Sequence, residues 1–280
     1  MTKLFSNISF KKFIEARLRP LPHKYVKILT DDESLKIYRQ SFTSAAVDPV
    51  NNYEYYEQMG DVTANKFLVY YFYKRFPVLK CTAGVKVVAR LKINYGSKKV
   101  FSELARKEGF WDWIDASEEE FSKCPIDLLE DTFEAFVGAT ESILDERVEP
   151  GVGAVAAELF LKRIFDAVDV SLKYKSLYDS KTRLKELFDL FGDQLGKIKY
   201  SELREYDSAG NQVTTSRVYR IVSRNRKPIL MAVGISKLKA DAQRAAAENA
   251  IDLLNSQNFI KHPPIEYQRF QLAPPICLRP

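Results

Sequence analysis

Three acidic residues in the first quarter of the chain are spaced for metal chemistry. Glu54, Glu57 and Asp61 follow one another at intervals of three and four residues. These intervals place the three carboxylates on one face of a helix. Carboxylate oxygens are hard ligands of the kind that Mg²⁺ prefers, so this face is a candidate metal site. The alternative is an ordinary solvated face, because acids at this spacing are common on exposed helices.

A second pair of acids lies in a much more apolar setting. Asp131 and Glu134 are three residues apart within segment 128–138, which is otherwise rich in Leu, Phe and Val. Acids in such a segment are expected near the edge of the core, where carboxylates repel one another and a divalent cation is a suitable counter-charge. Gly60 and Gly138 each cost a helix about 1 kcal/mol relative to alanine, which predicts close approach of two backbones there.

The scarcity of histidine limits which types of catalytic and metal-binding site are possible. The chain of 280 residues contains two histidines, His23 and His262, and three cysteines without CxxC spacing, Cys81, Cys124 and Cys277. This composition disfavours histidine-centred catalysis, multi-histidine metal sites, thiolate zinc sites and a disulfide framework. Any catalysis is therefore expected from carboxylates, hydroxyls or lysine.

Basic residues gather in the last part of the chain. Residues 171–280 hold 19 Lys and Arg against 11 Asp and Glu, which leaves 24 against 26 in residues 1–170. Such an imbalance predicts two modules with different partners. Segment 217–244 is either an anion-binding surface or a solvated face. Its basic residues, set against the single acid Asp241, are Arg217, Arg220, Arg224, Arg226, Lys227, Lys237, Lys239 and Arg244.

The elements that must position these residues are helical up to about residue 172 and mixed afterwards. Segments 53–76 and 126–143 show helical periodicity, the first stopping before Pro77 and the second starting after Pro125. Segment 84–93 mixes β-branched and basic residues and fits neither pattern. From residue 179 on, the pattern predicts a helix, three antiparallel strands and a final helix. These elements are expected at 181–191, 197–206, 212–223, 229–233 and 237–254, with turns at 207–211 and 225–228.

Two of these motifs resemble signatures of the ribonuclease III family. Glu57-Gln-Met-Gly-Asp61 is similar to the family's signature helix, whose pattern is Asn-Glu-Arg-Leu-Glu-Phe-Leu-Gly-Asp. Asp131-Thr-Phe-Glu-Ala-Phe-Val-Gly-Ala139 resembles its second acidic motif. Segment 179–187 resembles the first helix of a double-stranded-RNA-binding domain, and segment 234–247 resembles its last loop and helix. The divergent signature resembles homologues from large DNA viruses more than bacterial ones.

The resemblance, which covers about residues 30–256, implies a multidomain chain. An all-α ribonuclease III endonuclease domain is followed by an α-β-β-β-α (α+β) double-stranded-RNA-binding domain. The implied boundaries are 1–172 for the endonuclease domain, 173–178 for a linker, 179–256 for the RNA-binding domain and 257–280 for a C-terminal tail.

The resemblance also assigns roles to the acidic residues. Glu57, Asp61, Asp131 and Glu134 match the family's four metal-binding catalytic carboxylates, and Glu54 matches a supporting residue of the site. The implied activity is hydrolysis of double-stranded RNA, with Mg²⁺ as cofactor or Mn²⁺ in its place, to short duplexes with 5′-phosphate and 3′-hydroxyl ends. One pair of motifs makes one cleavage site per chain, so cutting both strands implies a homodimer.

Contacts with RNA are implied in the second domain. Lys237 and Lys239 would contact phosphates, whereas Thr182 and Glu186 would face the minor groove, which a domain of this type reads without sequence preference. The alternative for these four residues is a solvated surface.

The chain departs from the family's pattern at several positions. Tyr53 replaces the asparagine of the signature, and Gln58 replaces a phenylalanine that packs at the dimer contact in the family. The turn at 207–211 contains no histidine, and Ala240 occupies a lysine position, so weaker RNA binding is expected.

Other functions are compatible with this sequence. A non-catalytic RNA-binding or ribosome-associated protein of the same fold is disfavoured, because such proteins usually lose some of the four acids. A suppressor of RNA silencing would use the same chemistry. No apolar run reaches the roughly 18–20 residues of a membrane span, so no membrane partner is expected. The expected location is the cytoplasm, of a host cell if the source is viral. Residues 1–14 are expected to form a surface helix, with a mitochondrial import sequence as the alternative.

Overall fold

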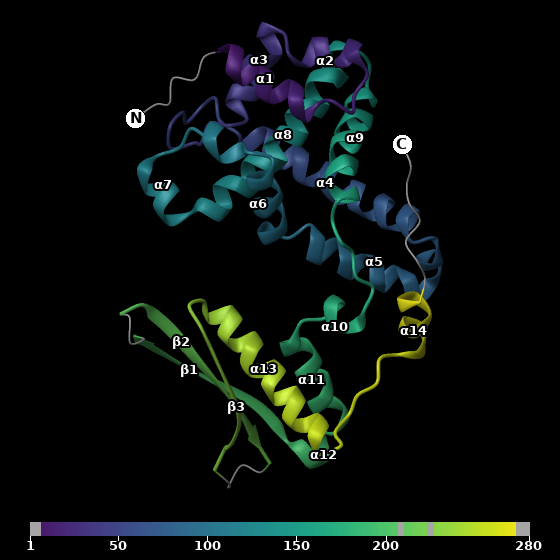
Figure 1. The fold of residues 1–280 in the computed structure, drawn as a ribbon, viewed down its shortest axis with the longest axis vertical. Coiled ribbons are helices and arrows are strands. Elements are labelled where there is room, and N and C mark those ends of the chain that lie inside the picture. The colour runs from purple at the N-terminus through teal and green to yellow at the C-terminus, as the bar shows by residue number, and fades with distance from the viewer. Residues whose placement is uncertain (1–6, 207–209, 223–226, 273–280) are drawn as a thin grey trace. The chain divides into compact units, whose positions relative to one another are not determined.

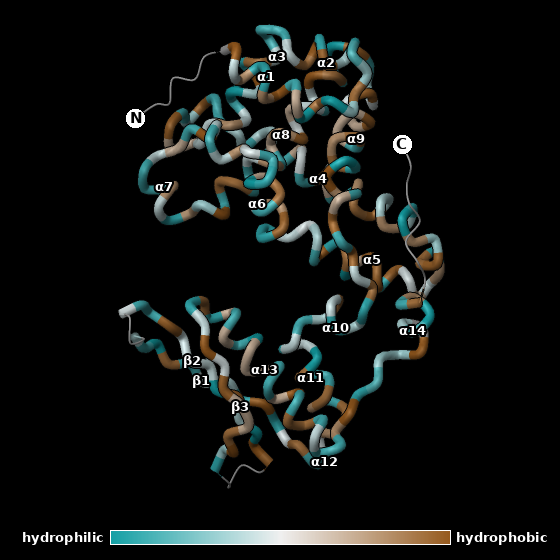
Figure 2. Tube along the Cα trace, in the orientation of Figure 1, coloured by the Kyte–Doolittle hydropathy of each residue, from teal (hydrophilic) through white to brown (hydrophobic). Residues whose placement is uncertain are grey.

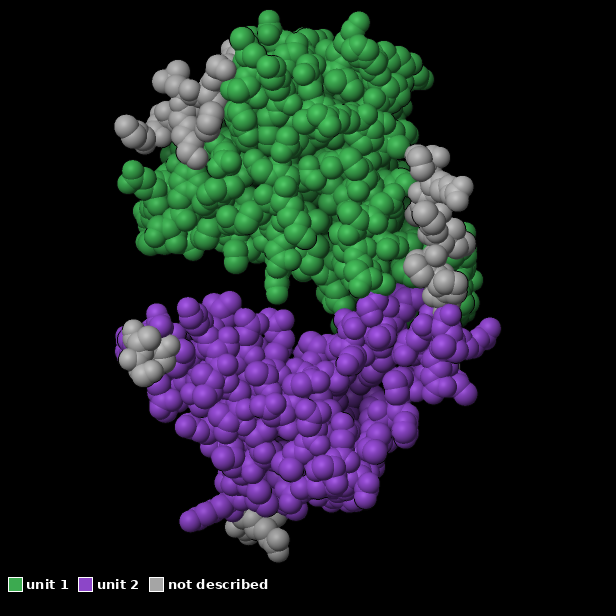
Figure 3. All heavy atoms as spheres, in the orientation of Figure 1, with its two compact units in different colours: residues 1–170, 273–280 green, residues 171–272 purple. Residues whose placement is uncertain are grey.

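The computed structural model describes residues 7–206, 210–222 and 227–272, which fall into two compact units (Figures 1 and 3). Of the described residues, those up to 170 form unit 1 and those from 171 to 272 form unit 2. The described part of unit 1 is helical, whereas unit 2 adds a three-stranded sheet. The predicted order, a helical domain followed by a helix, three strands and a helix, is confirmed.

Unit 1 is built around two long helices, α4 and α8. Its helices are α1 (Asn7–Arg17), α2 (His23–Leu29), α3 (Asp32–Gln40), α4 (Glu54–Arg75), α5 (Thr82–Tyr95), α6 (Lys98–Lys107), α7 (Glu118–Lys123), α8 (Pro125–Arg147) and α9 (Val152–Asp166), with 3-10 turns at Pro77–Leu79 and Phe110–Trp113. No described helix is both long enough and apolar enough to cross a membrane.

Local chemistry fixes the ends of both long helices. Acidic side chains in the first turn of α4 and basic ones in its last turn complement the helix dipole. Proline at the first position of α8 has no N–H that would need a partner there. The unassigned segment 84–93 lies within α5, because Gly84, Val87, Val88 and Leu91 are buried together at helical spacing.

Two glycines bring α4 and α8 into backbone contact. A Cβ atom added at Gly60 would lie 1.8 Å from the carbonyl oxygen of Glu134, and one added at Gly138 would lie 2.0 Å from that of Tyr56. No side chain fits at either distance, so the predicted close approach of two backbones is confirmed. This contact fixes how the acids of α4 face those of α8.

An aromatic core holds the remaining helices against α8. The Phe136 ring lies 4.8 Å from that of Phe160 in α9 and 5.1 Å from that of Tyr38 in α3, measured between ring centroids. In α1, Phe10 and Phe13 are buried against Phe42. The part of residues 1–14 that the structure describes is therefore a helix of this unit.

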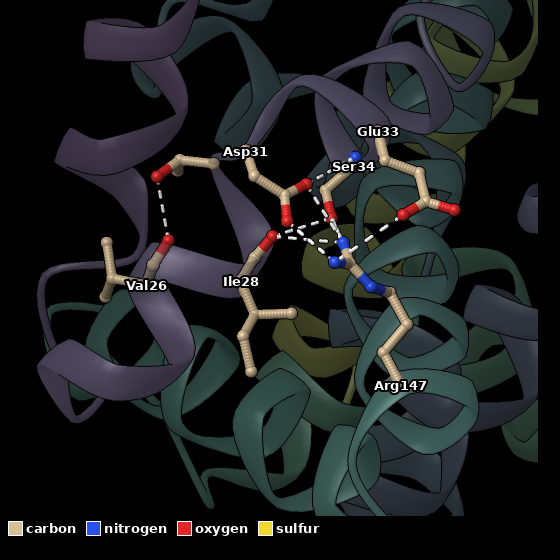
Figure 4. A network of polar contacts seen from close by, with 7 residues as sticks. Val26, Ile28, Asp31, Glu33, Ser34 and Arg147 are labelled. Carbon is tan, nitrogen blue, oxygen red and sulfur yellow. Dashed lines mark hydrogen bonds and ion pairs between the residues drawn. The ribbon is translucent and has the colours of Figure 1, made fainter.

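Arg147, the last residue of α8, binds the turn between α2 and α3 through hydrogen bonds and an ion pair (Figure 4). Arg147 donates to both oxygens of Asp31, at 2.9 and 2.7 Å, and to the Ser34 hydroxyl at 2.7 Å. Asp31 in turn accepts from the backbone N–H of Ser34 and so caps α3. The Arg147 guanidinium lowers the pKa of Asp31 to about 2. The C-terminal end of α8 is thereby anchored at a position 13 residues beyond Glu134.

Unit 2 contains an antiparallel sheet of order β1–β2–β3. Its elements are α10 (Tyr174–Leu177), α11 (Ser180–Leu190), α12 (Gly192–Leu195), β1 (Lys197–Tyr206), β2 (Gln212–Ile221), β3 (Ile229–Ser236), α13 (Lys239–Ser256) and α14 (Ile265–Gln271). In the hydropathy colouring of Figure 2, β3 is largely hydrophobic and β1 is mixed. The predicted turns at 207–211 and 225–228 fall partly outside the described residues.

The antiparallel sheet packs against helices α11 and α13. Lys197 pairs with Ile221 at one end of β1–β2, and Tyr206 pairs with Gln212 at the other. Gly234 of β3 permits close packing on α13, since a Cβ atom there would lie 2.3 Å from the Ala246 nitrogen. The core of this unit is formed by apolar residues of α11, β2 and α13.

Unit 2 is larger than the domain outlined from the sequence. Residues 173–178 contain α10, and part of the segment assigned to a tail forms α14. Tyr174 and Tyr178 of the first segment contact Tyr267 of the second, and the hydroxyls of Tyr178 and Tyr267 are 2.8 Å apart. Aromatic contacts between distant segments, which local sequence patterns do not reveal, add both pieces to the unit.

Candidate active site

The acids of α4 lie on its surface. Glu54 and Asp61 are exposed, and Glu57 is half-buried between them. Burial, followed by the negative charges of Glu130, Glu54 and Asp61, raises the pKa of the Glu57 carboxyl. These side chains therefore share one negatively charged face of the helix, as their spacing predicts.

The acids of α8 are much less accessible. Glu134 is only 6% exposed, and Asp131 is half-buried. Burial is the main cause that raises the pKa of Glu134 to about 9, and the charge of Asp61 is the next. Burial and the charge of Glu57 likewise raise the pKa of Asp131 to about 7. The prediction that these two acids lie at the edge of the core is confirmed.

Electrostatic coupling shows that the two groups face a common region. The charges of Asp61 and Glu57, both on α4, raise the pKa of Glu134 on α8. Glu130 belongs to the same region, because its charge raises the pKa of Glu57, Asp131 and Glu134. The sequence contained a signal for this sixth acid, since Glu130 and Glu134 are four residues apart and share a helix face.

Neutral groups orient two of the carboxylates. The buried hydroxyl group of Tyr53 donates to Oδ2 of Asp131 at 3.1 Å, which lowers the pKa of that carboxyl and partly offsets its burial. Asn65 donates through Nδ2 to Oδ1 of Asp61 at 2.6 Å, and its own Oδ1 accepts from Nζ of Lys92 at 3.1 Å. Tyr53, noted in the sequence only as a departure from the signature, is thus in contact with the acidic group.

Basic side chains do not neutralise the four acids. Lys98 of α6 binds Asp127 at 2.5 Å and Glu130 at 2.8 Å. The ion pairs found among the described residues include none of Glu57, Asp61, Asp131 and Glu134. Lys98 forms no ion pair with Glu57 or Asp131, but its charge lowers the pKa of both, so the mutual repulsion of the four acids is only partly offset.

This donor set fits a divalent cation that retains part of its water shell. All four groups offer hard carboxylate oxygens, and their repulsion favours a positive ion between them. Within the described ranges, no three Asp, Glu, His or Cys side chains lie close enough together to hold one ion directly. Mg²⁺ is commonly bound by one or two carboxylates and several waters, so this arrangement is compatible with it.

The residues predicted to bind RNA lie in unit 2 but do not form one free surface. Lys237 is exposed, and Nζ of Lys239 lies 3.6 Å from a carboxylate oxygen of Glu202. Thr182 donates through its hydroxyl to Asp179 at 2.8 Å near the start of α11. Glu186 accepts a hydrogen bond from the hydroxyl of Tyr174.

Similarity to known proteins places the chain in a family. A protein of Invertebrate iridescent virus 6, named provisionally as a ribonuclease 3, is 39% identical over 275 residues, covering 93% of this chain and 92% of that protein. The chain belongs to the ribonuclease III family. This confirms the predicted family and the likeness to proteins of large DNA viruses.

Further relatives of this ribonuclease III family chain come from a virus and from bacteria. A protein of Frog virus 3, named in the same provisional way, is 38% identical over 240 residues, and the match spans 60% of its length. Ribonuclease 3 of Streptococcus mutans is 26% identical over 233 residues, covering 81% of this chain and 93% of that enzyme. No family model matches the chain.

Solved structures of ribonuclease III proteins also align with the chain. The nuclease domain of ribonuclease III from Campylobacter jejuni aligns over 56% of this chain and 97% of its own, with 18% identity and a TM-score of 0.43. Dicer from Pichia stipitis aligns over 83% of this chain and 96% of its own, with 18% identity and a TM-score of 0.35.

Proposed function

We propose that this protein is a Mg²⁺-dependent endoribonuclease that cleaves double-stranded RNA into short duplexes with 5′-phosphate and 3′-hydroxyl ends. The observation that carries the proposal is the group of acids from two helices that form no ion pair among the described residues, joined at the contact between Gly60 and Gly138. A purely RNA-binding protein would gain nothing from holding buried carboxylates at the free-energy cost of their desolvation. Family membership supports the same reaction class.

The roles proposed for the site residues follow from their surroundings. Glu57, Asp61, Asp131 and Glu134 would hold one or more cations as ionised carboxylates, in part through waters of the metal's shell, with Glu54 adding negative charge beside Glu57. A bound divalent cation supplies an activated water and stabilises charge on the leaving oxygen. The hydroxyl of Tyr53 would keep Asp131 oriented, and no histidine is required.

Unit 2 would supply binding to the duplex. Lys237 and Lys239 are proposed to contact phosphates, and Thr182 and Glu186 to face the minor groove. Replacing both lysines with alanine should weaken RNA binding and make it less dependent on salt. With the value for duplex DNA as a guide, each lost phosphate contact reduces the slope of log affinity against log salt concentration by roughly 0.9. Lys12→Ala, on exposed surface of α1, is the matched control. An unchanged slope in the double variant would assign these lysines to a solvated surface.

A homodimer is proposed because α4 exposes an apolar stripe. Tyr55, Met59 and Val62 are 57%, 40% and 65% exposed and lie at helical spacing on the side away from Glu57. Exposed apolar residues in such a row mark an interaction surface more often than isolated ones do. Met59→Lys should shift the protein toward the monomer in light scattering, whereas a dimer of unchanged affinity would place the contact elsewhere.

The activity is tested most simply with labelled RNA. Purified protein should cut long double-stranded RNA to short duplexes in Mg²⁺ or Mn²⁺ and leave single-stranded RNA and double-stranded DNA largely intact. Cleavage that continues undiminished in excess chelator would contradict the metal-dependent reaction. The cytoplasmic location stays a prediction.

A further inference from the structure

Unit 2 contains a cavity that the two added segments create. It has a volume of about 350 Å³ and lies between α10, α11, α13 and the chain that leads into α14. Its apolar lining comes from Leu187 and Ile251, both buried, and from Ile260 and Pro263. The aromatic contacts of Tyr267 with Tyr174 and Tyr178 hold the segments in place on one side. The cavity is thus a feature of the enlarged unit and not of the helix–strand–helix core alone.

The charged groups of the cavity wall are mainly basic. Lys173, Lys175, Arg183 and Lys261 line it, against one acid, Glu186. Glu186 is already satisfied, because it accepts from the hydroxyl of Tyr174 and pairs with Nζ of Lys261 at 2.8 Å.

The cations differ in whether they have a partner. Arg183 binds Glu248 on α13 and donates through Nε to the Tyr178 carbonyl oxygen at 3.2 Å. Lys173 and Lys175 are exposed and occur in none of the ion pairs found among the described residues. Two lysines without counter-ions therefore stand at the mouth of an apolar hollow, which suits a ligand with an anionic end and a less polar body.

We propose that this cavity binds a nucleoside 5′-monophosphate group, with the base and sugar against the apolar wall and the phosphate on Lys173 and Lys175. Its volume suits one nucleotide and excludes a duplex. A terminal phosphate monoester carries up to two negative charges, whereas an internal diester carries one, so two unpaired lysines favour the terminal group. The group has two sources, a free nucleotide or the 5′ end of an RNA strand.

If the phosphate is the 5′ end of an RNA strand, the cavity takes part in the proposed nuclease function. Assigning the phosphate to an RNA strand therefore rests on that function. Glu186 belongs both to the cavity wall and to the surface of α11 that is proposed to face RNA. A 5′-phosphate is also the end that the proposed cleavage would produce. The cavity would then hold on to a cleaved end, or select RNA that already carries one.

Direct binding measurements on the full chain test this proposal. Isothermal calorimetry would compare adenosine 5′-monophosphate with adenosine and with inorganic phosphate. In parallel, a short RNA duplex with 5′-phosphates would be compared with the same duplex carrying 5′-hydroxyls, in chelator so that nothing is cut. The test variant is Lys173→Glu with Lys175→Glu. The control, Lys199→Glu with Arg204→Glu, reverses the same number of charges on exposed positions of β1.

We expect the monophosphate to bind more tightly than either the nucleoside or phosphate alone. We also expect the phosphorylated duplex to bind at least about tenfold more tightly than its hydroxyl counterpart. The test variant should lose this preference, and the control should keep it. A preference for the duplex end without measurable binding of free nucleotide identifies the strand end as the source, and the reverse identifies the free nucleotide.

Two results would overturn the proposal: no preference for phosphate in the wild-type protein, or a preference that survives in the test variant. Cleavage of long RNA with 5′-hydroxyl ends, measured on the same samples, distinguishes failure of the cavity proposal from failure of the proposed nuclease activity. Intact cleavage without a phosphate preference rejects only the cavity. A phosphate preference without cleavage rejects only the proposed nuclease activity.

Discussion

The acids of α4 and those of α8 differ in how they meet solvent. Asp61 on α4 is exposed, whereas Glu134 on α8 is 6% exposed and has a pKa raised to about 9. Asp131 on α8 is half-buried, and its pKa is raised to about 7. The acids of α4 are thus more accessible to a cation from solvent, whereas Glu134 of α8 must first lose a proton to bind one at neutral pH.

This difference explains why the site needs both helices. Four exposed acids would bind a cation weakly, since water competes for both partners and salt screens them. Buried acids bind it more strongly, because the cation removes a repulsion that the protein offsets only in part. The contact of Gly60 with the Glu134 carbonyl brings the two kinds of acid together.

The largest effect is expected at the buried side. Glu134→Gln keeps the size of the side chain but removes its charge, so the site loses a ligand. Since a metal contributes several kcal/mol to transition-state stabilisation, single-turnover cleavage should slow on the order of a thousandfold. RNA affinity in a gel-shift assay should change little.

The matched control for this variant is Glu118→Gln on α7, an exposed acid outside both motifs. It should cleave at the wild-type rate. Near wild-type cleavage by Glu134→Gln would remove Glu134 from the site and much of the case for a nuclease.

A second substitution tests the contact that joins the two sides. Gly60→Ala places a methyl group where the Glu134 carbonyl oxygen lies, so the helices must separate. Overpacking of this kind costs about 1–3 kcal/mol of unfolding free energy, and cleavage should fall with it. Gly192→Ala is the control, because nothing lies within 4 Å of the added atom. Equal denaturation midpoints for the two variants would contradict the backbone contact.

The pH dependence of stability should separate the buried acid from the exposed ones. Without a cation, the folded protein keeps its proton on Glu134 up to about pH 9, whereas the unfolded chain releases it at about pH 4.3. The stability that this group contributes is present below the lower value and is lost as pH rises through the higher one. Glu134→Gln lacks this loss.

Thermal unfolding in chelator measures this directly. The glutamine variant should become progressively more stable relative to wild type between pH 5 and pH 9, and added Mg²⁺ should stabilise only the wild type. A difference that stays constant with pH would mean that Glu134 is not held protonated by burial.

The smallest effect is expected from the group that orients Asp131. Tyr53→Phe removes a hydrogen bond that lowers the pKa of Asp131, so the acid limb of the pH–rate profile should move to higher pH. Cleavage near neutral pH should then slow several-fold. Tyr70→Phe, an exposed tyrosine on the same helix, should leave the profile unchanged. An unshifted limb in Tyr53→Phe would show that its hydroxyl does not act on the carboxyl.

Local patterns in the sequence predicted much of this arrangement. Periodicity and flanking prolines located α4 and α8, and the acids at helical spacing marked the candidate site. The alternation of residues 197–206 gave β1 with the same bounds. These features depend on residues close together in the chain, so they are readable without a structure.

Features that depend on distant residues were missed. The contact of Tyr53 with Asp131 joins residues 78 positions apart, and Lys98 reaches Glu130 from another helix. The packing of Tyr267 against Tyr174 likewise enlarged unit 2 beyond its predicted limits. Segment 84–93 was unassigned because its β-branched residues disfavour a helix locally, whereas burial of Val87, Val88 and Leu91 decides the outcome.

Proton release on Mg²⁺ binding tests the central claim most directly. At pH 8 a carboxyl with a pKa of about 9 is mostly protonated, and it must ionise to bind a cation. Calorimetric titration in two buffers of different ionisation enthalpy should therefore show about one proton released per ion bound by the wild type. Glu134→Gln should release close to none. Saturable binding by the wild type without proton release would contradict the account.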